Sequence, residues 1–165
     1  MPALLITIVA PALLAAAPLL ALQNTIYTPR VGSAERTAII SAVKGGSDAQ
    51  LRYTFKKLRV FHSGRRAIAY AEGEGGVGGF RVILAREGGA PWRSVWGEGD
   101  GGSDSCAAGA RHYEWALRLI KSYKVAPDAL FPGITERTRE LKRMAVSEPE
   151  TQCVGDLEGG GEIEG

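Results

Sequence analysis

The sequence predicts an α+β fold: an N-terminal helix, a four-stranded antiparallel sheet of two hairpins, and a C-terminal helical extension. Three observations support this class. Apolar residues recur at helical spacing in 34–44, alternate with polar residues in four runs between 51 and 96, and return to helical spacing after 105. The chain has 165 residues, 45% apolar and 23% charged, which is ordinary for a globular protein.

The N-terminal segment predicts export. Residues 4–22 are apolar apart from Thr7, and alanine is frequent in the second half, which is typical of a secretory signal. We therefore expect a signal peptide at 1–22, a single α+β domain at 23–155 and a disordered Gly/Glu-rich tail at 156–165. The segment contains no Lys or Arg, so an uncleaved membrane anchor and a buried helix remain alternatives for it.

The first helix is expected at 34–44. Ser33 is a good N-cap residue, and Gly45-Gly46 ends the element. A strand follows at 51–62. Its apolar residues change parity around Lys56-Lys57, which predicts a β-bulge there.

The remaining strands are separated by glycine-containing turns. The segment 72–79 is expected to be a glycine-rich connection between the two hairpins. Alternating apolar residues predict the second, third and fourth strands at 67–71, 80–84 and 92–96.

Two longer helices are expected in the C-terminal extension. Asp104 or Ser105 can cap the first of them, and Thr135 is expected to cap the second, with Leu141 and Met144 pointing inward. The first has an apolar stripe at helical spacing, formed by Ala116, Leu119, Ile120 and Tyr123.

The chain has two cysteines, Cys106 and Cys153. Two cysteines in an exported protein commonly pair, so we expect a disulfide; two unpaired buried thiols are the alternative. Closing a loop of about 48 residues would stabilise the fold by roughly 4 kcal/mol. The sequence has neither a C-x-x-C motif nor a Cys/His cluster, so we expect no redox site and no zinc.

The order of elements resembles a known architecture. A helix followed by a four-stranded meander, with Trp92 in the last hairpin, resembles the cystatin-like or NTF2-like folds. The stretch 27–36 also resembles the start of small exported bacterial proteins in which a G-[DS]-x-E-R-x-A-I helix precedes such a sheet; here it is Gly32-Ser33-Ala34-Glu35-Arg36-Thr37-Ala38-Ile39. The resemblance covers 27–100 and implies a fold that hosts binding and catalysis alike. The helical extension at 106–153 lies outside it.

Motifs for cofactors and catalysis are weak. The run 73–78 fits G-x-G-x-x-G, but the residues after it alternate as a strand, so we expect a hairpin loop and no cofactor. There is no G-x-S-x-G elbow, and the sequence positions of His62 and His112 suit inert histidines. The acidic loop at 100–104 is too short for a calcium loop, so we expect no metal.

One arrangement would suit a hydrolase. Four acidic residues stand near strand ends and could meet at one rim of the sheet, as paired carboxylates do in glycoside hydrolases; they are Glu72, Glu74, Glu98 and Asp100. Turn residues in water are the plainer interpretation, and the sequence as a whole favours a protein that is not an enzyme.

Charge is distributed unevenly along the chain. The formal net charge is only +2, which does not suggest a nucleic-acid partner. Six basic residues with no intervening acid, Arg52, Lys56, Lys57, Arg59, Arg65 and Arg66, mark the first hairpin as a candidate partner-binding surface. Trp96 is included in this surface because alternation places it on the same face of its strand as Trp92. Neutralisation of the hairpin by the acidic tail, and tryptophans in the core, are the alternatives.

These features predict a periplasmic or secreted binding protein without enzymatic activity, such as an envelope inhibitor or an immunity-type protein that blocks another protein. Contact with a membrane is expected only if the N-terminal segment stays uncleaved. A small-ligand or hydrolytic pocket of NTF2-like form is the alternative, and a structural protein held by its N-terminal helix is a third.

Overall fold

The computed structural model describes residues 25–45, 51–76 and 78–161, so the predicted signal peptide lies outside the described residues. An antiparallel sheet with the strand order β1-β2-β3-β4-β7 crosses the middle of the molecule. Its strands are β1 (Tyr53–Ser63), β2 (Arg66–Gly75), β3 (Gly78–Glu87), β4 (Arg93–Gly99) and β7 (Leu157–Gly159). The predicted α+β class is confirmed, with a fifth strand added to the expected four.

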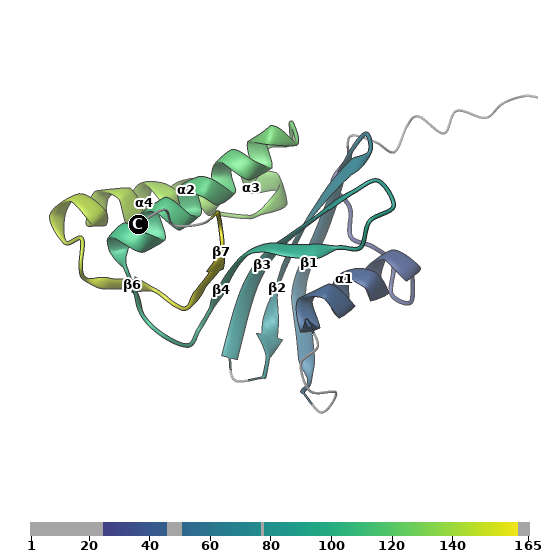
Figure 1. The fold of residues 1–165 in the computed structure, drawn as a ribbon, viewed down its shortest axis with the longest axis horizontal. Helices are drawn as coiled ribbons and strands as arrows, with labels where there is room; N and C mark the ends of the chain where they lie inside the picture. Colours follow the sequence, from purple (N-terminus) through teal and green to yellow (C-terminus); the bar gives the residue numbers. More distant parts are fainter. Residues whose placement is uncertain (1–24, 46–50, 77, 162–165) are drawn as a thin grey trace, which may run out of the picture.

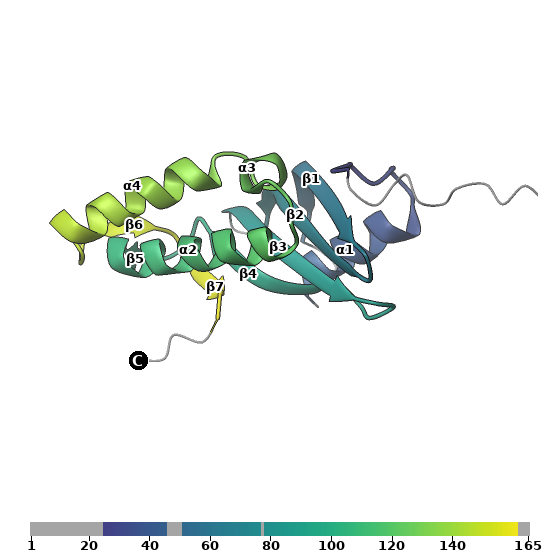
Figure 2. The ribbon, with the colours of Figure 1, turned by 90° about the horizontal axis from the view of Figure 1, so that it is seen from above.

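Helices cover both faces of this sheet (Figure 1). Helix α1 (Ala34–Lys44) lies on one face; α2 (Cys106–Ser122), α3 (Pro127–Leu130) and α4 (Ile134–Ser147) lie on the other. Figure 2 shows α4 running alongside α2. Two short strands, β5 (Asp104–Ser105) and β6 (Gln152–Val154), pair with each other beside the start of α2.

Each face of the sheet has its own hydrophobic core. Toward α2 the core contains the fully buried side chains of Tyr70, Ile83 and Trp96, and Phe131 stacks on Tyr70 with ring centroids 4.2 Å apart. Toward α1 it contains Ile39 and a smaller set of sheet residues. The interface between the sheet and α2 is therefore filled by side chains.

Helix α1 has the bounds that the sequence predicts. The Ser33 hydroxyl accepts a hydrogen bond from the backbone N–H of Arg36 at 3.2 Å, which satisfies a free donor of the first turn. Gly45 ends the helix in the left-handed region, with φ +54°. Between these caps, Ile39 is completely buried against the sheet.

The first hairpin contains the predicted bulge and is longer than predicted. The register of β1 against β2 shifts between Phe55 and Lys57, as the change of parity indicates. The prediction of a loose connection at 72–79 is wrong, because pairing of β2 with β3 continues to Gly75. A Cβ at Gly73 would come within 2.0 Å of the Thr54 carbonyl oxygen, so glycine allows close approach of these strands.

A second bulge changes the placement of the tryptophans. Ile83 pairs with Trp96 but Leu84 pairs with Ser94, which leaves Val95 as an extra residue in β4. Trp96 therefore points into the core under α2, whereas Trp92 points into the core under α1. The expectation that both share one face is wrong, since the bulge reverses the parity.

The C-terminal helices begin at caps of different kinds. The Ser105 hydroxyl accepts from the N–H of Ala108, as one of the two predicted caps of α2. The prediction that Thr135 caps α4 is wrong: α4 begins after Gly133, and the Asp128 carboxylate accepts from the Thr135 N–H at 3.2 Å. A side chain of α3 thus replaces the local cap.

The last described segment returns to the body of the protein. Cys106 and Cys153 form the predicted disulfide, which joins the start of α2 to β6. Beyond it, β7 pairs antiparallel with β4, Trp96 lying opposite Gly159. The prediction of a disordered tail from 156 is therefore wrong for 156–161; residues 162–165 lie outside the described residues.

We expect the double variant Cys106→Ala/Cys153→Ala to lose about 4 kcal/mol of its free energy of unfolding, because the unfolded chain regains the entropy of a long loop. Urea denaturation followed by tryptophan fluorescence measures this loss. A reductant should destabilise the wild type by a similar amount and leave the variant unchanged. Equal stabilities of variant and oxidised wild type would contradict the prediction.

Candidate functional site

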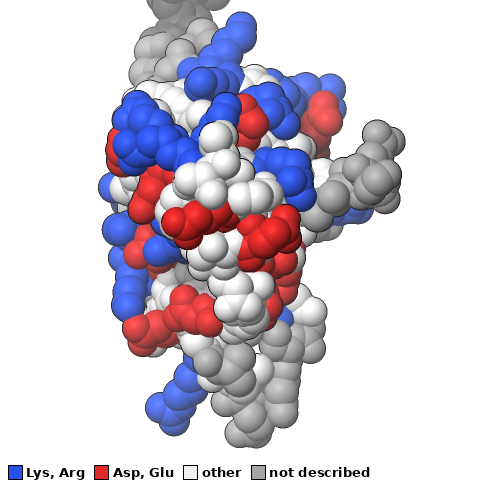
Figure 3. All heavy atoms as spheres, turned by 90° about the vertical axis from the view of Figure 1, so that its left-hand side faces the viewer, with Lys and Arg blue, Asp and Glu red and all other residues white. Residues whose placement is uncertain are grey.

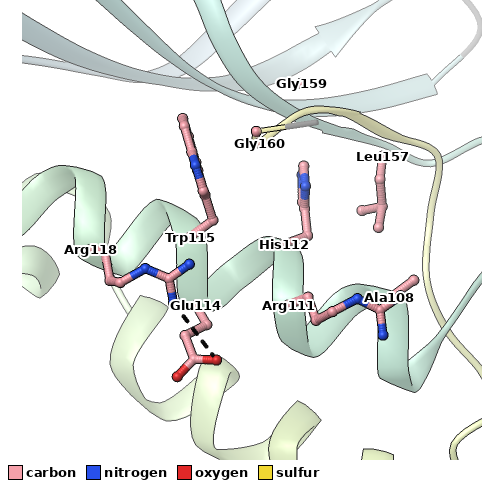
Figure 4. Close-up of a pocket in the computed structure, with 10 residues that line it drawn as sticks. Ala108, Arg111, His112, Glu114, Trp115, Arg118, Leu157, Gly159 and Gly160 are labelled. Atoms are coloured by element: carbon pink, nitrogen blue, oxygen red, sulfur yellow. Dashed lines mark ion pairs between the residues drawn. The ribbon is translucent and has the colours of Figure 1, made fainter. Parts of the chain in front are cut away.

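A hollow of about 380 Å³ opens between α2 and the chain that forms β7 (Figure 4). We call it the α2–β7 hollow. Its lining combines aromatic, basic and glycine residues: Ala108, Arg111, His112, Glu114, Trp115, Arg118, Leu157, Gly159, Gly160 and Gly161. A hollow of this volume suits a small molecule.

Helical periodicity explains why α2 supplies one wall. Ala108, Arg111, Trp115 and Arg118 recur every three or four residues, so they lie along one stripe of the helix. Figure 4 shows the rings of His112 and Trp115 projecting from this stripe toward the glycine segment. The opposite stripe, with Ala116 and Ile120, is buried.

Glycine forms the facing wall because other residues would not fit. Gly159, Gly160 and Gly161 all have positive φ, at +66°, +81° and +78°. A Cβ at Gly160 would stand 2.4 Å from Nδ1 of His112, and one at Gly161 would stand 2.7 Å from Nε1 of Trp115. Three left-handed glycines thus bring the backbone directly against both rings.

His112 is a neutral, oriented ring at the inner end of the hollow. Its Nε2–H donates to the Gly97 carbonyl oxygen at 2.8 Å, and Trp96 stacks on it with centroids 4.8 Å apart. Burial lowers the pKa of His112 below its ordinary value, although the bond to Gly97 opposes the shift. Because Nε2 carries the proton, Nδ1 is unprotonated and can accept a hydrogen bond. Nδ1 lies beside Gly160.

The charges at the hollow favour an anion. Arg111 and Arg118 are both exposed. Glu114 is the acid among the lining residues, and Lys142 of α4 donates to its Oε1 at 3.1 Å. The Arg118 guanidinium is 3.9 Å from Glu114 Oε2, which is too long for a hydrogen bond.

The predicted partner-binding surface on the first hairpin is largely engaged within the protein. Lys56 donates to Glu74 at 2.5 Å, and Lys57 pairs with Glu72 at 3.1 Å. These acids belong to β2. The two lysines are therefore neutralised by the neighbouring strand and not by the acidic tail, which is the alternative from the sequence. Both lysines remain exposed.

Two arginines of the same set attach β1 and β2 to the helical layer. Arg59 donates to the Ala129 carbonyl at 2.6 Å, and Arg66 donates to the Ser122 carbonyl at 2.9 Å while lying over the ring of Tyr123. Arg52 and Arg65 are exposed, and Arg65 lies beside Gly88.

Trp96 does not belong to a surface. Its side chain is 0% exposed, and its indole N–H donates to the His112 carbonyl at 3.1 Å. The prediction of Trp96 as a partner-binding residue is therefore wrong, and the reason is the bulge that turns it inward.

Figure 3 shows basic and acidic side chains intermixed on the end of the molecule formed by α4 and β6, so this end has no large patch of a single charge.

The four acidic residues predicted to meet at one rim do line a common hollow of about 190 Å³, together with Lys56 and Arg81. Each carboxylate has a partner. Tyr70 donates to Glu72 at 2.7 Å, Tyr113 and Arg81 donate to Glu98, and the Gly79 N–H donates to Asp100.

These contacts form a hydrogen-bonded network around the carboxylates. Burial would raise the pKa of Glu72, but Tyr70 and Lys57 outweigh burial and lower it below its ordinary value. Burial and the neighbouring carboxylates raise the pKa of Tyr70 and Tyr113, so these phenols stay protonated. A paired-carboxylate hydrolase needs one ionised carboxylate and one carboxyl group that holds a proton near neutral pH, and Glu72 suits only the ionised role.

A third polar cluster anchors α1. Tyr27 donates to Glu35 at 2.6 Å, Arg86 donates to it at 3.0 Å, and His62 lies 3.1 Å from it. The E-R motif in the sequence marks Glu35, but its partners come from distant segments that no local pattern connects. Because three groups from the N-terminal segment, β1 and β3 converge on one carboxylate, the cluster holds the start of α1 against the sheet.

Among the described residues, no group of three or more His, Cys, Asp and Glu is placed to hold a metal ion. Within 25–45, 51–76 and 78–161, no helix is both long and apolar enough to cross a membrane.

No family model, curated protein or solved structure matches this chain. The resemblance to cystatin-like and NTF2-like folds therefore remains a prediction from the sequence.

We expect the stability of the fold to respond to protonation of His112. The folded protein binds the proton less readily than the unfolded chain, whose histidine pKa is near 6.5. Lowering the pH through that value therefore favours unfolding, by at most about 1.4 kcal/mol for each pH unit from one group.

His112→Gln keeps a donor for Gly97 and removes the titration. Urea denaturation between pH 7.5 and pH 5 should show a steeper loss of stability for the wild type than for His112→Gln. The carboxylates and His62 are common to both proteins, so their contributions cancel in the comparison. Parallel stability curves would contradict the placement of His112 as a buried neutral ring.

Proposed function

We propose that this chain is an exported, non-enzymatic binding protein whose α2–β7 hollow takes a small ligand. One observation carries the proposal: a stripe of α2 that includes Trp115 and the neutral His112, together with a wall of three glycines, lines a space of about 380 Å³. Two exposed arginines also line this space. A ligand pocket usually combines an aromatic or apolar surface with a small number of polar groups.

Export is supported by two features. The apolar segment 4–22 has the pattern of a secretory signal, and the Cys106–Cys153 disulfide suits an oxidising compartment. Because that disulfide holds the segment leading to β7, oxidation also supports the geometry of the hollow.

A small ligand accounts for the surface better than a protein partner does. Four of the six basic residues of the first hairpin have carboxylate or carbonyl partners within the chain, and Trp96 is buried. A protein partner would have to displace these contacts. The α2–β7 hollow needs no such rearrangement.

We expect fragments from a fluorine-labelled library to bind in the hollow, because it has an aromatic wall and open space. Fluorine NMR screening of the oxidised protein, followed by mapping of chemical shifts, measures this. Ala108→Trp should abolish the shared hits by filling the hollow from α2.

Ala90→Trp is the control for this screen, since Ala90 is an exposed turn residue that does not line the hollow. It should bind the same fragments as the wild type. Hits that survive Ala108→Trp, or an absence of hits at 108–118 and 157–161, would refute the proposed binding site.

A further inference from the structure

We propose that the α2–β7 hollow recognises a small molecule in which a carboxylate stands next to a flat aromatic ring. The inference rests on the proposed function and adds the chemistry of its ligand.

The carboxylate is inferred from the two arginines of the hollow, of which Arg118 has only a long ion pair to Glu114. Arg111 and Arg118 both line the hollow, with Glu114 between them in sequence. One oxygen of Glu114 is committed to Lys142 at 3.1 Å, and the other is 3.9 Å from Arg118. The side chain of Arg118 is 65% exposed. A guanidinium donates to a carboxylate through a planar fork, so a ligand anion gains charged hydrogen bonds that Glu114 does not supply.

The aromatic ring of the ligand is inferred from the residues that line the hollow. Trp115 offers an aromatic surface, Leu157 an apolar one, and the glycine segment lacks side chains that would occupy the space. A flat aromatic group can stack on the Trp115 indole, and aromatic rings prefer an offset stack to a direct face-to-face one.

His112 fixes the direction in which the ligand lies. Nδ1 carries a lone pair and the ring is neutral, so this end of the hollow disfavours an anion. The carboxylate is therefore directed away from His112 and toward Arg118, and the ring lies against Trp115 beside the glycine wall. A single ring with one carboxylate arm falls within the ligand sizes that a space of about 380 Å³ holds.

Three probes separate the two parts of this ligand: phenylacetate has both ring and charge, phenylacetamide has the ring without the charge, and acetate has the charge without the ring. The chain has three tryptophans, and only Trp115 lines the hollow, so the indole N–H signals in an NMR titration report the site directly. Phenylacetate should shift the Trp115 signal and leave those of Trp92 and Trp96 nearly unchanged. Phenylacetamide should bind at least about tenfold more weakly, and acetate should cause no saturable shift.

The double variant Arg111→Gln/Arg118→Gln should weaken phenylacetate binding at least about tenfold and leave phenylacetamide binding unchanged. Arg139→Gln/Arg143→Gln is the matched control: it removes the same charge from exposed side chains of α4 that do not line the hollow. Its affinity for phenylacetate should stay within about twofold of the wild type.

Three results would overturn the inference. If phenylacetamide binds as tightly as phenylacetate, or both arginine double variants lose affinity equally, the arginines do not recognise a carboxylate, although the hollow still binds ligands. If phenylacetate leaves the Trp115 signal unmoved, the aromatic carboxylate is the wrong class. The fluorine screen then decides separately whether the hollow binds any small molecule.

Discussion

The return of the C-terminal segment to the body of the protein is the constraint on which the rest of this structure depends. The Cys106–Cys153 disulfide joins the segment to the start of α2, and β7 then pairs with the edge of the sheet. The two attachments fix both ends of the chain between them. They turn an exposed stripe of α2 into one wall of a hollow, since Gly160 and Gly161 now face His112 and Trp115.

The sequence predicts the elements whose signals are local and misses those whose partners are distant. Ser33 and Gly45 delimit α1, and the change of parity at Lys56-Lys57 marks the bulge, because caps and alternation are properties of neighbouring residues. The bulge at Val95 has no such signal, so Trp96 is assigned to the wrong face. Glycine composition likewise suggests a free tail, whereas β7 forms because the edge of β4 is available to it.

The candidate site was harder to predict than the fold for a related reason. Basic residues in one stretch suggest a binding surface, but a sequence does not show which of them already have partners, and Lys57, Arg59 and Arg66 do. The α2–β7 hollow combines a helical stripe with glycines from a segment some 40 residues later. Each part looks ordinary alone: the histidine resembles an inert one, and the glycines resemble a linker. Only their juxtaposition indicates ligand binding.

The most direct test of this account is whether Gly160 lies against His112 and Gly161 lies against Trp115 in solution. Nuclear Overhauser measurements on the oxidised protein should show cross-peaks between the His112 ring protons and the Hα protons of Gly160, and between the Trp115 indole protons and the Hα protons of Gly161. The Gly160 amide, which donates to the Val95 carbonyl, should exchange slowly. Absence of these cross-peaks, together with rapid exchange at Gly160, would contradict the pairing of β7 and remove the hollow.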